Sequence, residues 1–310
     1  MPSQFSVKIY GCRGSIPVTG SEHVKYGGAT SCVVVKAGNR EIVLDGGSGI
    51  VTYGRELAAR RSESGQPINR TLFFSHVHFD HVMGLPYFSP LYMVDTTLYL
   101  FGPRSNRFES FEDTLDTLIQ SPFYPVALHE MHAQKHFVDF TEPDVVYFLK
   151  GRDEPLKMRP GHPSYKDRIP SPEVIEAEVH CMRGYNHPKS GVNLYKVICD
   201  GRSFVYATDT EGFVHGDRRL IRFAENTELV LHDAMYTESH YTSTCMPTQG
   251  YGHSTVEIAA DLAKKSGAKR LGLFHHDPKS TDDHLDRIEE LGQSLFPESF
   301  AARDGLEIIL

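Results

Sequence analysis

Four side chains that can bind a metal ion lie within six residues of one another in the segment Ser75–Val82, SHVHFDHV. They are His76, His78, Asp80 and His81, in the spacing H-x-H-x-D-H. The segment follows directly on a short apolar run that is typical of a buried strand. Because residues two apart at a strand end point the same way, His76 and His78 could share one ion, and the two residues beyond the bend could reach a second. A single loop therefore predicts two metal sites.

The crowding of these four side chains favours a metal over an ordinary polar loop. A lone histidine in a loop is usually a satisfied polar side chain, but three imidazoles and a carboxylate this close together would repel one another if protonated. A divalent cation satisfies all four at once. Because the donors are nitrogen and oxygen without a thiolate, they favour zinc, with manganese or iron as the alternatives.

Three more candidate ligands stand at the ends of apolar runs elsewhere in the chain. His187 lies in RGYNHPKSG, Asp209 ends SFVYATD, and His275 ends RLGLFH. Each alone is weak evidence, because histidine and aspartate are common in the turns that follow strands. The full predicted set is His76, His78 and His187 on one ion, Asp80, His81 and His275 on the other, and Asp209 between the two.

The order of these ligands along the chain resembles that of the metallo-β-lactamase superfamily. Asp45, in IVLDGGSG, also resembles the early Asp-Gly turn of that family, which packs beneath the metal loop. We expect Asp45 to support the site rather than to bind metal. The resemblance runs over nearly the whole chain and implies an αββα sandwich with two metal ions at one edge of its two sheets.

Finer motifs are similar to the ribonuclease Z-like and phosphodiesterase branch of that superfamily. GHST at Gly252–Thr255 resembles the His-Ser-Thr motif of the branch, and Asp233, in HDAMY, falls where those enzymes carry an acid that orients the motif's histidine. LYLFGP and HHDP also resemble branch patterns. The spacing to Pro278 favours His275 as the ligand, and its neighbour His276 is the alternative.

The resemblance implies hydrolysis by a hydroxide that bridges two metal ions about 3.5–4 Å apart. Asp80 would accept a proton from the attacking water, as is proposed for the family. His253 is the candidate donor of a proton to the leaving group, with Asp233 fixing its tautomer and raising its pKa. The alternative is that His253 is only a turn residue ahead of a helix that Ser254 or Thr255 caps.

Two β-rich halves are needed to position these residues. Strands are expected at Ser6–Tyr10, Cys32–Lys36, Glu41–Leu44, Thr71–Ser75, Glu176–Arg183, Leu194–Cys199, Ser203–Ala207, Leu229–Leu231 and Arg270–Phe274. Helices are expected at Val51–Arg61, Phe111–Gln120, Ser254–Lys265 and Asp282–Leu291. The prediction is therefore an α/β protein, a four-layer αββα sandwich formed by a single domain, 1–310, with an irregular insertion at roughly 102–172. Phe123 and Tyr124 of this insertion could stack on a base, although such aromatics are more often local core.

Composition limits the cellular setting. The 310 residues are 40% hydrophobic and 23% charged, without a run of eighteen apolar residues or a secretory signal at the start. Five cysteines at irregular spacing are typical of reduced, buried thiols. We therefore expect a cytoplasmic protein that does not contact a membrane.

Charge bears on the substrate. The formal net charge of −8, with scattered Lys and Arg, leaves no basic stripe to follow a nucleic-acid backbone, and a Gly- and Pro-rich basic arm is not evident. We therefore expect the substrate to be a cyclic or small nucleotide or a similar phosphodiester rather than a long nucleic acid. The alternatives are a tRNA 3′-processing endoribonuclease, a hydrolase of a thioester, lactone or sulfate ester, and a binding protein that kept the fold. The resemblance is compatible with a homodimer, for which the sequence has no signature of its own.

Overall fold

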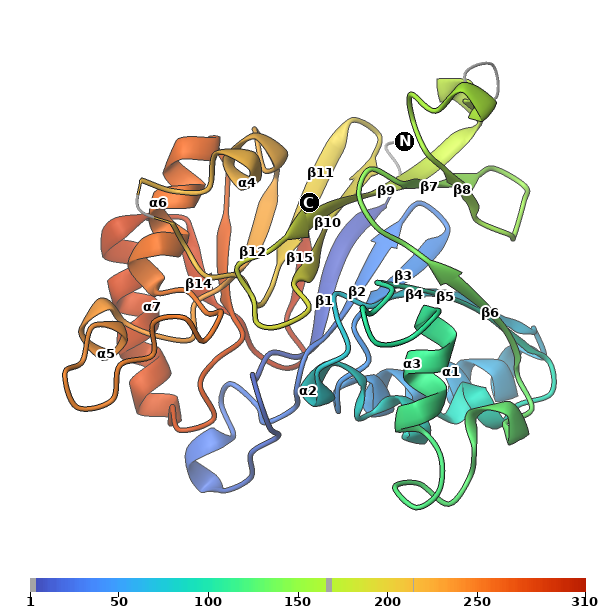
Figure 1. Ribbon diagram of the computed structural model, residues 1–310, viewed down its shortest axis with the longest axis horizontal. Helices are drawn as coiled ribbons and strands as arrows, with labels where there is room; N and C mark the ends of the chain where they lie inside the picture. Colours follow the sequence, from blue (N-terminus) through green and yellow to red (C-terminus); the bar gives the residue numbers. More distant parts are fainter. Residues whose placement is uncertain (1–3, 166–168, 214) are drawn as a thin grey trace.

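The computed structural model describes residues 4–165, 169–213 and 215–310. Its strands form two mixed sheets that pack face to face, and helices cover both outer faces (Figure 1). The predicted four-layer α/β/β/α arrangement is thus confirmed. No helix in the described part of the chain is long and apolar enough to cross a membrane.

The first sheet has seven strands in the order β15-β1-β2-β3-β4-β5-β6. Their bounds are β1 Phe5–Gly11, β2 Cys32–Ala37, β3 Arg40–Leu44, β4 Ile68–Phe73, β5 Thr96–Gly102, β6 Gln134–Asp139 and β15 Glu307–Ile309. β1 to β3 form an antiparallel meander, and β3 to β6 run parallel. Its outer face is covered by α1 Ile50–Ser64, α2 Phe79–Val82 and α3 Phe111–Leu118.

The second sheet has eight strands in the order β14-β13-β12-β11-β10-β9-β7-β8. Their bounds are β7 Val145–Leu149, β8 Leu156–Met158, β9 Ile175–Gly184, β10 Val192–Cys199, β11 Arg202–Ala207, β12 Leu229–Asp233, β13 Leu271–Phe274 and β14 Ser299–Ala301. β11 to β14 run parallel, and the other pairs are antiparallel. The helices of this half are α4 Arg218–Phe223, α5 Glu238–Tyr241, α6 Val256–Ser266 and α7 Asp282–Leu295.

Alternating side chains of each strand fill different layers of core. In β2, Val33 and Val35 join the apolar cluster between the sheets, whereas Cys32 and Val34 join the cluster beneath α1. This period of two is the one that a strand buried on both faces requires. Four of the five cysteines are buried, and all five are free thiols, as the composition predicts.

The segment 102–172 contributes more regular structure than its sequence predicts. It contains α3 as expected, but its β6 also extends the first sheet, and its β7 and β8 extend the second. The description of this segment as an irregular insertion was therefore incomplete. Its strands are short and lie among prolines and charged residues, so the alternation that identifies a strand is weak.

Parallel strands bring the candidate site residues together, because their carboxyl ends meet at one edge of each sheet. Asp45 follows β3, and the segment from His76 to His81 follows β4. Asp209 follows β11, and His275 follows β13. The two sheets face each other, so these four strand ends converge on one region between them.

Candidate metal centre

The first predicted group of ligands consists of three buried or half-buried imidazoles. Nitrogen atoms of His76, His78 and His187 all lie within 4.8 Å of one another. Nε2 of His187 is 2.9 Å from Nδ1 of His78, and the rings of His76 and His78 pack edge to face at 4.4 Å. Nε2 of His76 is buried without a hydrogen-bond partner among the residues that the structure describes. An unpartnered buried nitrogen among two others is the arrangement that a cation would satisfy.

Burial keeps these three imidazoles neutral. It lowers the pKa of His76 well below its usual value and lowers the pKa of His78 to about 4, and neighbouring histidines act in the same direction. The pKa of His187 is lowered for the same reason. A neutral imidazole presents a lone pair, which is the form that binds a metal.

The second predicted group combines two carboxylates with two imidazoles. Asp80 Oδ2 lies 3.2 Å from Nε2 of His81 and 3.1 Å from Nε2 of His275. Asp209 Oδ2 lies 3.1 and 3.2 Å from the same two nitrogens. All four side chains are buried, and their ligand atoms lie within 4.8 Å of one another. The four atoms surround one point, as the donors to a single ion would.

Asp209 faces both groups, one oxygen toward each. Its Oδ1 is 3.7 Å from Nε2 of His76 and 3.7 Å from Nε2 of His187, while Oδ2 contacts the second group. The backbone of Asp209 is left-handed, with φ 50°, a conformation that costs energy in most residues but that aspartate tolerates. The structure therefore places Asp209 where the sequence analysis expects a bridging carboxylate.

The charges of the second group fit a divalent cation. Burial opposes ionisation of Asp80 and Asp209, yet the facing histidines hold the pKa of both carboxyls well below the usual range. Burial likewise opposes a charge on His81, but Asp209, Asp80 and Asp45 raise its pKa well above the usual value. The group thus attracts positive charge strongly, and a bound cation would replace the proton of His81.

Contacts behind the ligands fix their tautomers. Nδ1 of His81 donates to Asp45 Oδ2 at 2.8 Å, and Nδ1 of His187 donates to the carbonyl oxygen of Gly252 at 3.0 Å. Asp45 also accepts from the Ser75 amide at 2.7 Å and from the Tyr206 hydroxyl at 2.9 Å. The contacts of His81 and His187 leave Nε2 of each ring directed into the site, which is the usual role of residues behind metal ligands. Asp45 supports His81 from behind and is not part of either donor group.

We expect Asp45→Asn to weaken metal binding about 10- to 100-fold, because the amide cannot hold the imidazole of His81 as a carboxylate does. Asparagine preserves the size of the side chain and tolerates its left-handed backbone, with φ 62°. Competition with a chromogenic chelator measures the affinity. Asp144→Asn is the control, because it changes a buried carboxylate that pairs with Arg159 and lies outside the donor groups. Equal metal affinity in both variants would contradict the role of Asp45.

Asp233 and His253 form a buried pair beside the second group. Nδ1 of His253 donates to Asp233 Oδ2 at 2.7 Å, and the His253 ring stacks on the ring of His275 at 5.0 Å. Burial lowers the pKa of His253, but Asp233 outweighs it and raises that pKa to about 9. Thr255 caps α6 through the amide of Ile258, so the helix cap and the Asp233–His253 pair are both present rather than alternatives.

The neighbouring histidines His275 and His276 have different surroundings. His275 has a left-handed backbone, with φ 62°, and its Nε2 joins the second group. Nε2 of His276 instead donates to the carbonyl oxygen of Ala302 at 2.8 Å, so this ring is directed away from the site. This geometry favours His275, as the sequence motif does.

Backbone contacts near the N-terminus were not predicted from the sequence. The amide of Ser15 donates to Asp80 Oδ2 at 2.8 Å, and Ser15 adopts φ 64°. A Cβ atom on Gly14 would lie 2.5 Å from Cε1 of His275, so only glycine fits against that ring. Arg13 is fully buried and donates to the carbonyl oxygens of Gly27 and Ser280, which holds this segment in place. A backbone amide donor has no residue type of its own, so no motif could have identified it.

An apolar cavity of about 330 Å³ lies against α2, the single-turn helix that carries Asp80 and His81. Its lining residues are Phe79, Val82, Met83, Pro86, Tyr87, Leu118, Ile119, Phe123 and Tyr124. Phe79 and Phe123 are 64% and 79% exposed, which is unusual for phenylalanine. Phe123 and Tyr124 therefore form a surface beside the candidate centre, and Phe123 is not local core.

Comparisons with known proteins find similar sequences and the same fold. The family model of the metallo-β-lactamase superfamily matches residues 26–99. Ribonuclease Z of Picrophilus torridus is 26% identical over 322 aligned residues, which cover 99% of this chain and 96% of that protein. The solved structure of YhfI from Bacillus subtilis, described as a metallo-β-lactamase fold protein, matches with a TM-score of 0.64 at 17% identity, over 99% of this chain and 100% of that one. Human tRNase Z, short form, matches with a TM-score of 0.59 at 20% identity, over 98% of each chain.

These similarities bear on the order of the predicted functions. They support a metal-dependent hydrolase, as expected from the sequence. They favour the ribonuclease Z-like alternative over the small phosphodiester that was expected first, because relatives with which this chain aligns over nearly its whole length are named ribonuclease Z. The scattered positive charge in the sequence had argued against that alternative.

Proposed function

We propose that this chain, a metal-dependent hydrolase similar to the metallo-β-lactamase superfamily, is a ribonuclease Z-like endonuclease that cleaves a phosphodiester bond in RNA. The observation that carries the proposal is the convergence of seven nitrogen and oxygen donors into two groups that share Asp209, beside a protonated histidine. This arrangement suits hydrolysis of an ester whose charge builds up on oxygen.

In this proposal each group of donors would hold one divalent ion. The residues of the first site are His76, His78 and His187; those of the second are Asp80, His81 and His275; Asp209 reaches both. Zinc suits the nitrogen-rich donor set best, ahead of manganese and iron. When bound, the two ions supply Lewis-acid activation of water and neutralise the phosphate oxygens.

Asp80 and His253 would then move the protons. Asp80 is ionised and is oriented by the Ser15 amide, so its carboxylate can accept a proton from the attacking water. His253 holds a proton near neutral pH, and its Nδ1 is engaged by Asp233, which leaves Nε2 to donate to the leaving oxygen. The ribose alkoxide is a poor leaving group, so this donation is needed for RNA.

A cyclic or small nucleotide is the second candidate substrate. The apolar cavity beside α2 favours it, because aromatic side chains such as Phe79 and Tyr87 could stack on one base next to the metal groups. The net charge of −8 is also easier to reconcile with a small substrate.

A substrate panel tests the proposal and separates the two candidates. The metal-loaded protein is given a precursor tRNA with a 3′ trailer, cyclic nucleotides, bis-p-nitrophenyl phosphate, a lactone and a thioester. We expect endonucleolytic cleavage of the RNA, with kcat/KM falling steeply between about 50 and 200 mM salt. Turnover of cyclic nucleotides without cleavage of RNA would establish the second candidate, and turnover of the lactone or thioester alone would refute phosphodiester chemistry.

A further inference from the structure

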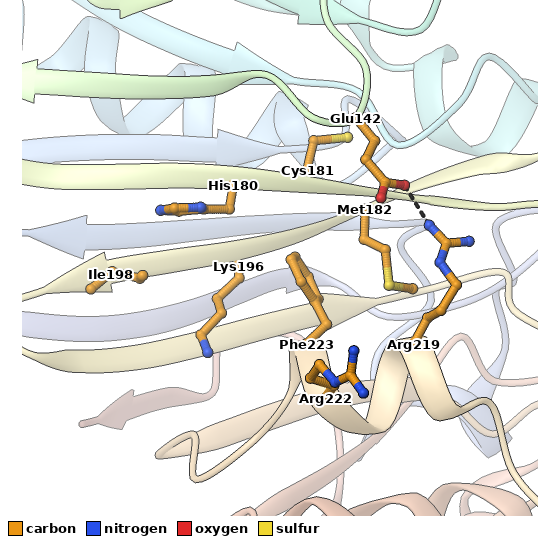
Figure 2. A pocket seen from close by; sticks show the side chains of 9 residues that line it. All are labelled: Glu142, His180, Cys181, Met182, Lys196, Ile198, Arg219, Arg222 and Phe223. Carbon is orange, nitrogen blue, oxygen red and sulfur yellow. Dashed lines mark hydrogen bonds and ion pairs between the residues drawn. The ribbon is translucent and has the colours of Figure 1, made fainter. Parts of the chain in front are cut away.

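A pocket of about 470 Å³ lies on the outer face of the second sheet, separate from both metal-binding groups (Figure 2). It is lined by Glu142, His180, Cys181, Met182, Lys196, Ile198, Arg219, Arg222 and Phe223. Its walls come from β9 and β10 on one side and from α4 on the other. Helices α4, α6 and α7 lie on the outer face of the second sheet (Figure 1), and the pocket lies beside α4 over part of β9 and β10.

The pocket gathers positive charge on a chain whose net charge is negative. Three cations line it, Lys196 from β10 and Arg219 and Arg222 from α4, against one carboxylate, Glu142. Glu142 is paired with Arg219. Within the described residues, the side chains of Lys196 and Arg222 form no ion pair or hydrogen bond; burial lowers the pKa of Lys196, and the charge of nearby Glu225 opposes that shift. Two free cations in a recess are an electrostatic site for an anion.

This positive surface continues in two directions from the pocket. Arg222 also lines a neighbouring hollow of about 310 Å³, together with Arg218, Lys265 and one acid, Glu225; Lys265 is paired with Asp261. On the other side, the guanidinium of Arg219 lies over the ring of Tyr185 at 6.0 Å. Tyr185 is 78% exposed and stands two residues before His187, a member of the first donor group. The cationic surface therefore reaches the rim of the candidate metal centre.

The floor of the pocket is apolar. Met182 and Phe223 lie between the cations of the two walls, and Figure 2 shows Phe223 placed between Lys196 and Met182. Cations that contact phosphates and an aromatic face that stacks on a base are the two elements of a single-stranded nucleic-acid site. An inorganic anion alone would not need the apolar floor.

We propose that this pocket is an exosite that binds the backbone of an RNA substrate, at a distance from the bond that is cut. The inference rests on the proposed ribonuclease function and adds where the rest of the RNA lies. Binding would place one or more phosphates between Lys196 and Arg222, with a base against Phe223. The RNA strand would then run past Arg219 and Tyr185 toward His187. The protein, whose net charge is −8, would thus bind a polyanion through a local cluster of positive side chains.

The double variant Lys196→Gln/Arg222→Gln tests the exosite in the metal-loaded protein. The probe is a fluorescent RNA hairpin with a single-stranded 3′ extension, and anisotropy measures its affinity across a salt series. We expect binding to weaken about ten-fold at low salt, and the slope of log affinity against log salt to fall by about 1.4 to 1.8, since each lost phosphate contact contributes about 0.7 to 0.9. Turnover of bis-p-nitrophenyl phosphate, which is too small to reach the pocket, should not change.

Lys264→Gln/Arg287→Gln is the matched control, because it removes two exposed cations from α6 and α7 with the same change in net charge. Equal RNA affinity and equal salt slope in the two double variants would overturn the exosite. If RNA binds through the pocket but is never cut, the exosite is supported and the nuclease function is refuted. A wild-type protein that neither binds nor cuts the RNA would refute both. Circular dichroism of each variant shows that it is folded.

Discussion

Asp209→Asn is expected to lower kcat/KM for every diester by at least about 10³-fold, equivalent to about 4 kcal/mol of transition-state stabilisation. The variant should also bind one metal ion per chain instead of two. The physical reason is that Asp209 directs one carboxylate oxygen to each group of donors, and a neutral amide cannot share its charge between two cations. Asparagine keeps the shape of the side chain and tolerates the left-handed backbone, so the fold should survive.

A matched control exists for this substitution. Asp200 also has a left-handed backbone, with φ 49°, in the turn between β10 and β11, and it lies outside both donor groups. Asp200→Asn makes the same chemical change and should leave activity and metal content as they are. Kinetics and metal analysis by mass spectrometry are the readouts. An Asp209→Asn protein with two tightly bound ions and wild-type turnover would show that the carboxylate does not bridge the groups.

His253→Ala should lower kcat for RNA cleavage about 10²- to 10⁴-fold, because a proton donor is lost. Both metal ions should remain bound, because His253 belongs to neither of the two groups proposed to hold them; a third cluster, Asp209, Asp233, His253 and His275, does include it, so metal content is measured alongside activity. The loss should be much smaller for bis-p-nitrophenyl phosphate. Nitrophenolate leaves without a proton, so a general acid contributes little to that reaction. This difference between substrates separates proton donation from a merely structural role of the Asp233–His253 pair.

The exposed residue His132 provides the control for this second prediction. His132→Ala removes an imidazole outside the site and should leave both reactions unchanged. If His253→Ala slowed the two substrates equally, the side chain would position the site rather than donate a proton. If it slowed neither, the assignment of His253 would be wrong.

The candidate ligands could be found from the sequence because each lies in a segment that directly follows a strand. The spacing H-x-H-x-D-H after β4 places four of them in the first sheet's half. Asp209 and His275 share one edge of the second sheet, because β11, β12 and β13 run parallel, and the face-to-face packing of the two sheets brings this edge to the β4 loop. The sandwich itself followed from two β-rich halves that each need to bury two faces. Local pattern and tertiary packing agree at these positions.

The rest of the site depends on contacts that cannot be predicted from residue type. The Ser15 amide that orients Asp80 is a backbone donor, and Gly14 is required only because the ring of His275 lies against it. The proposed exosite could not be predicted from the sequence for a different reason. Lys196 on β10 and Arg222 on α4 are far apart in the chain and meet only when α4 packs against the sheet, so scattered charges in the sequence become a local cluster.

Strand prediction failed where the chain joins its two halves. β6, β7 and β8 lie in the segment 102–172, where prolines and turns interrupt the alternation of apolar and polar residues. β6 pairs with β5 and β7 pairs with β9, both distant in sequence, whereas β8 pairs with the neighbouring β7 and reaches the second sheet only through it. Long-range pairing of this kind overrides weak local preference.

Anomalous diffraction from crystals grown with zinc or manganese, recorded at the absorption edge of the metal, tests the central claim most directly. We expect two peaks about 3.5–4 Å apart, with Asp209 between them and the three imidazoles of His76, His78 and His187 around one of them. A single peak, no peak in excess metal, or a pair of peaks that Asp209 does not touch would contradict the binuclear centre.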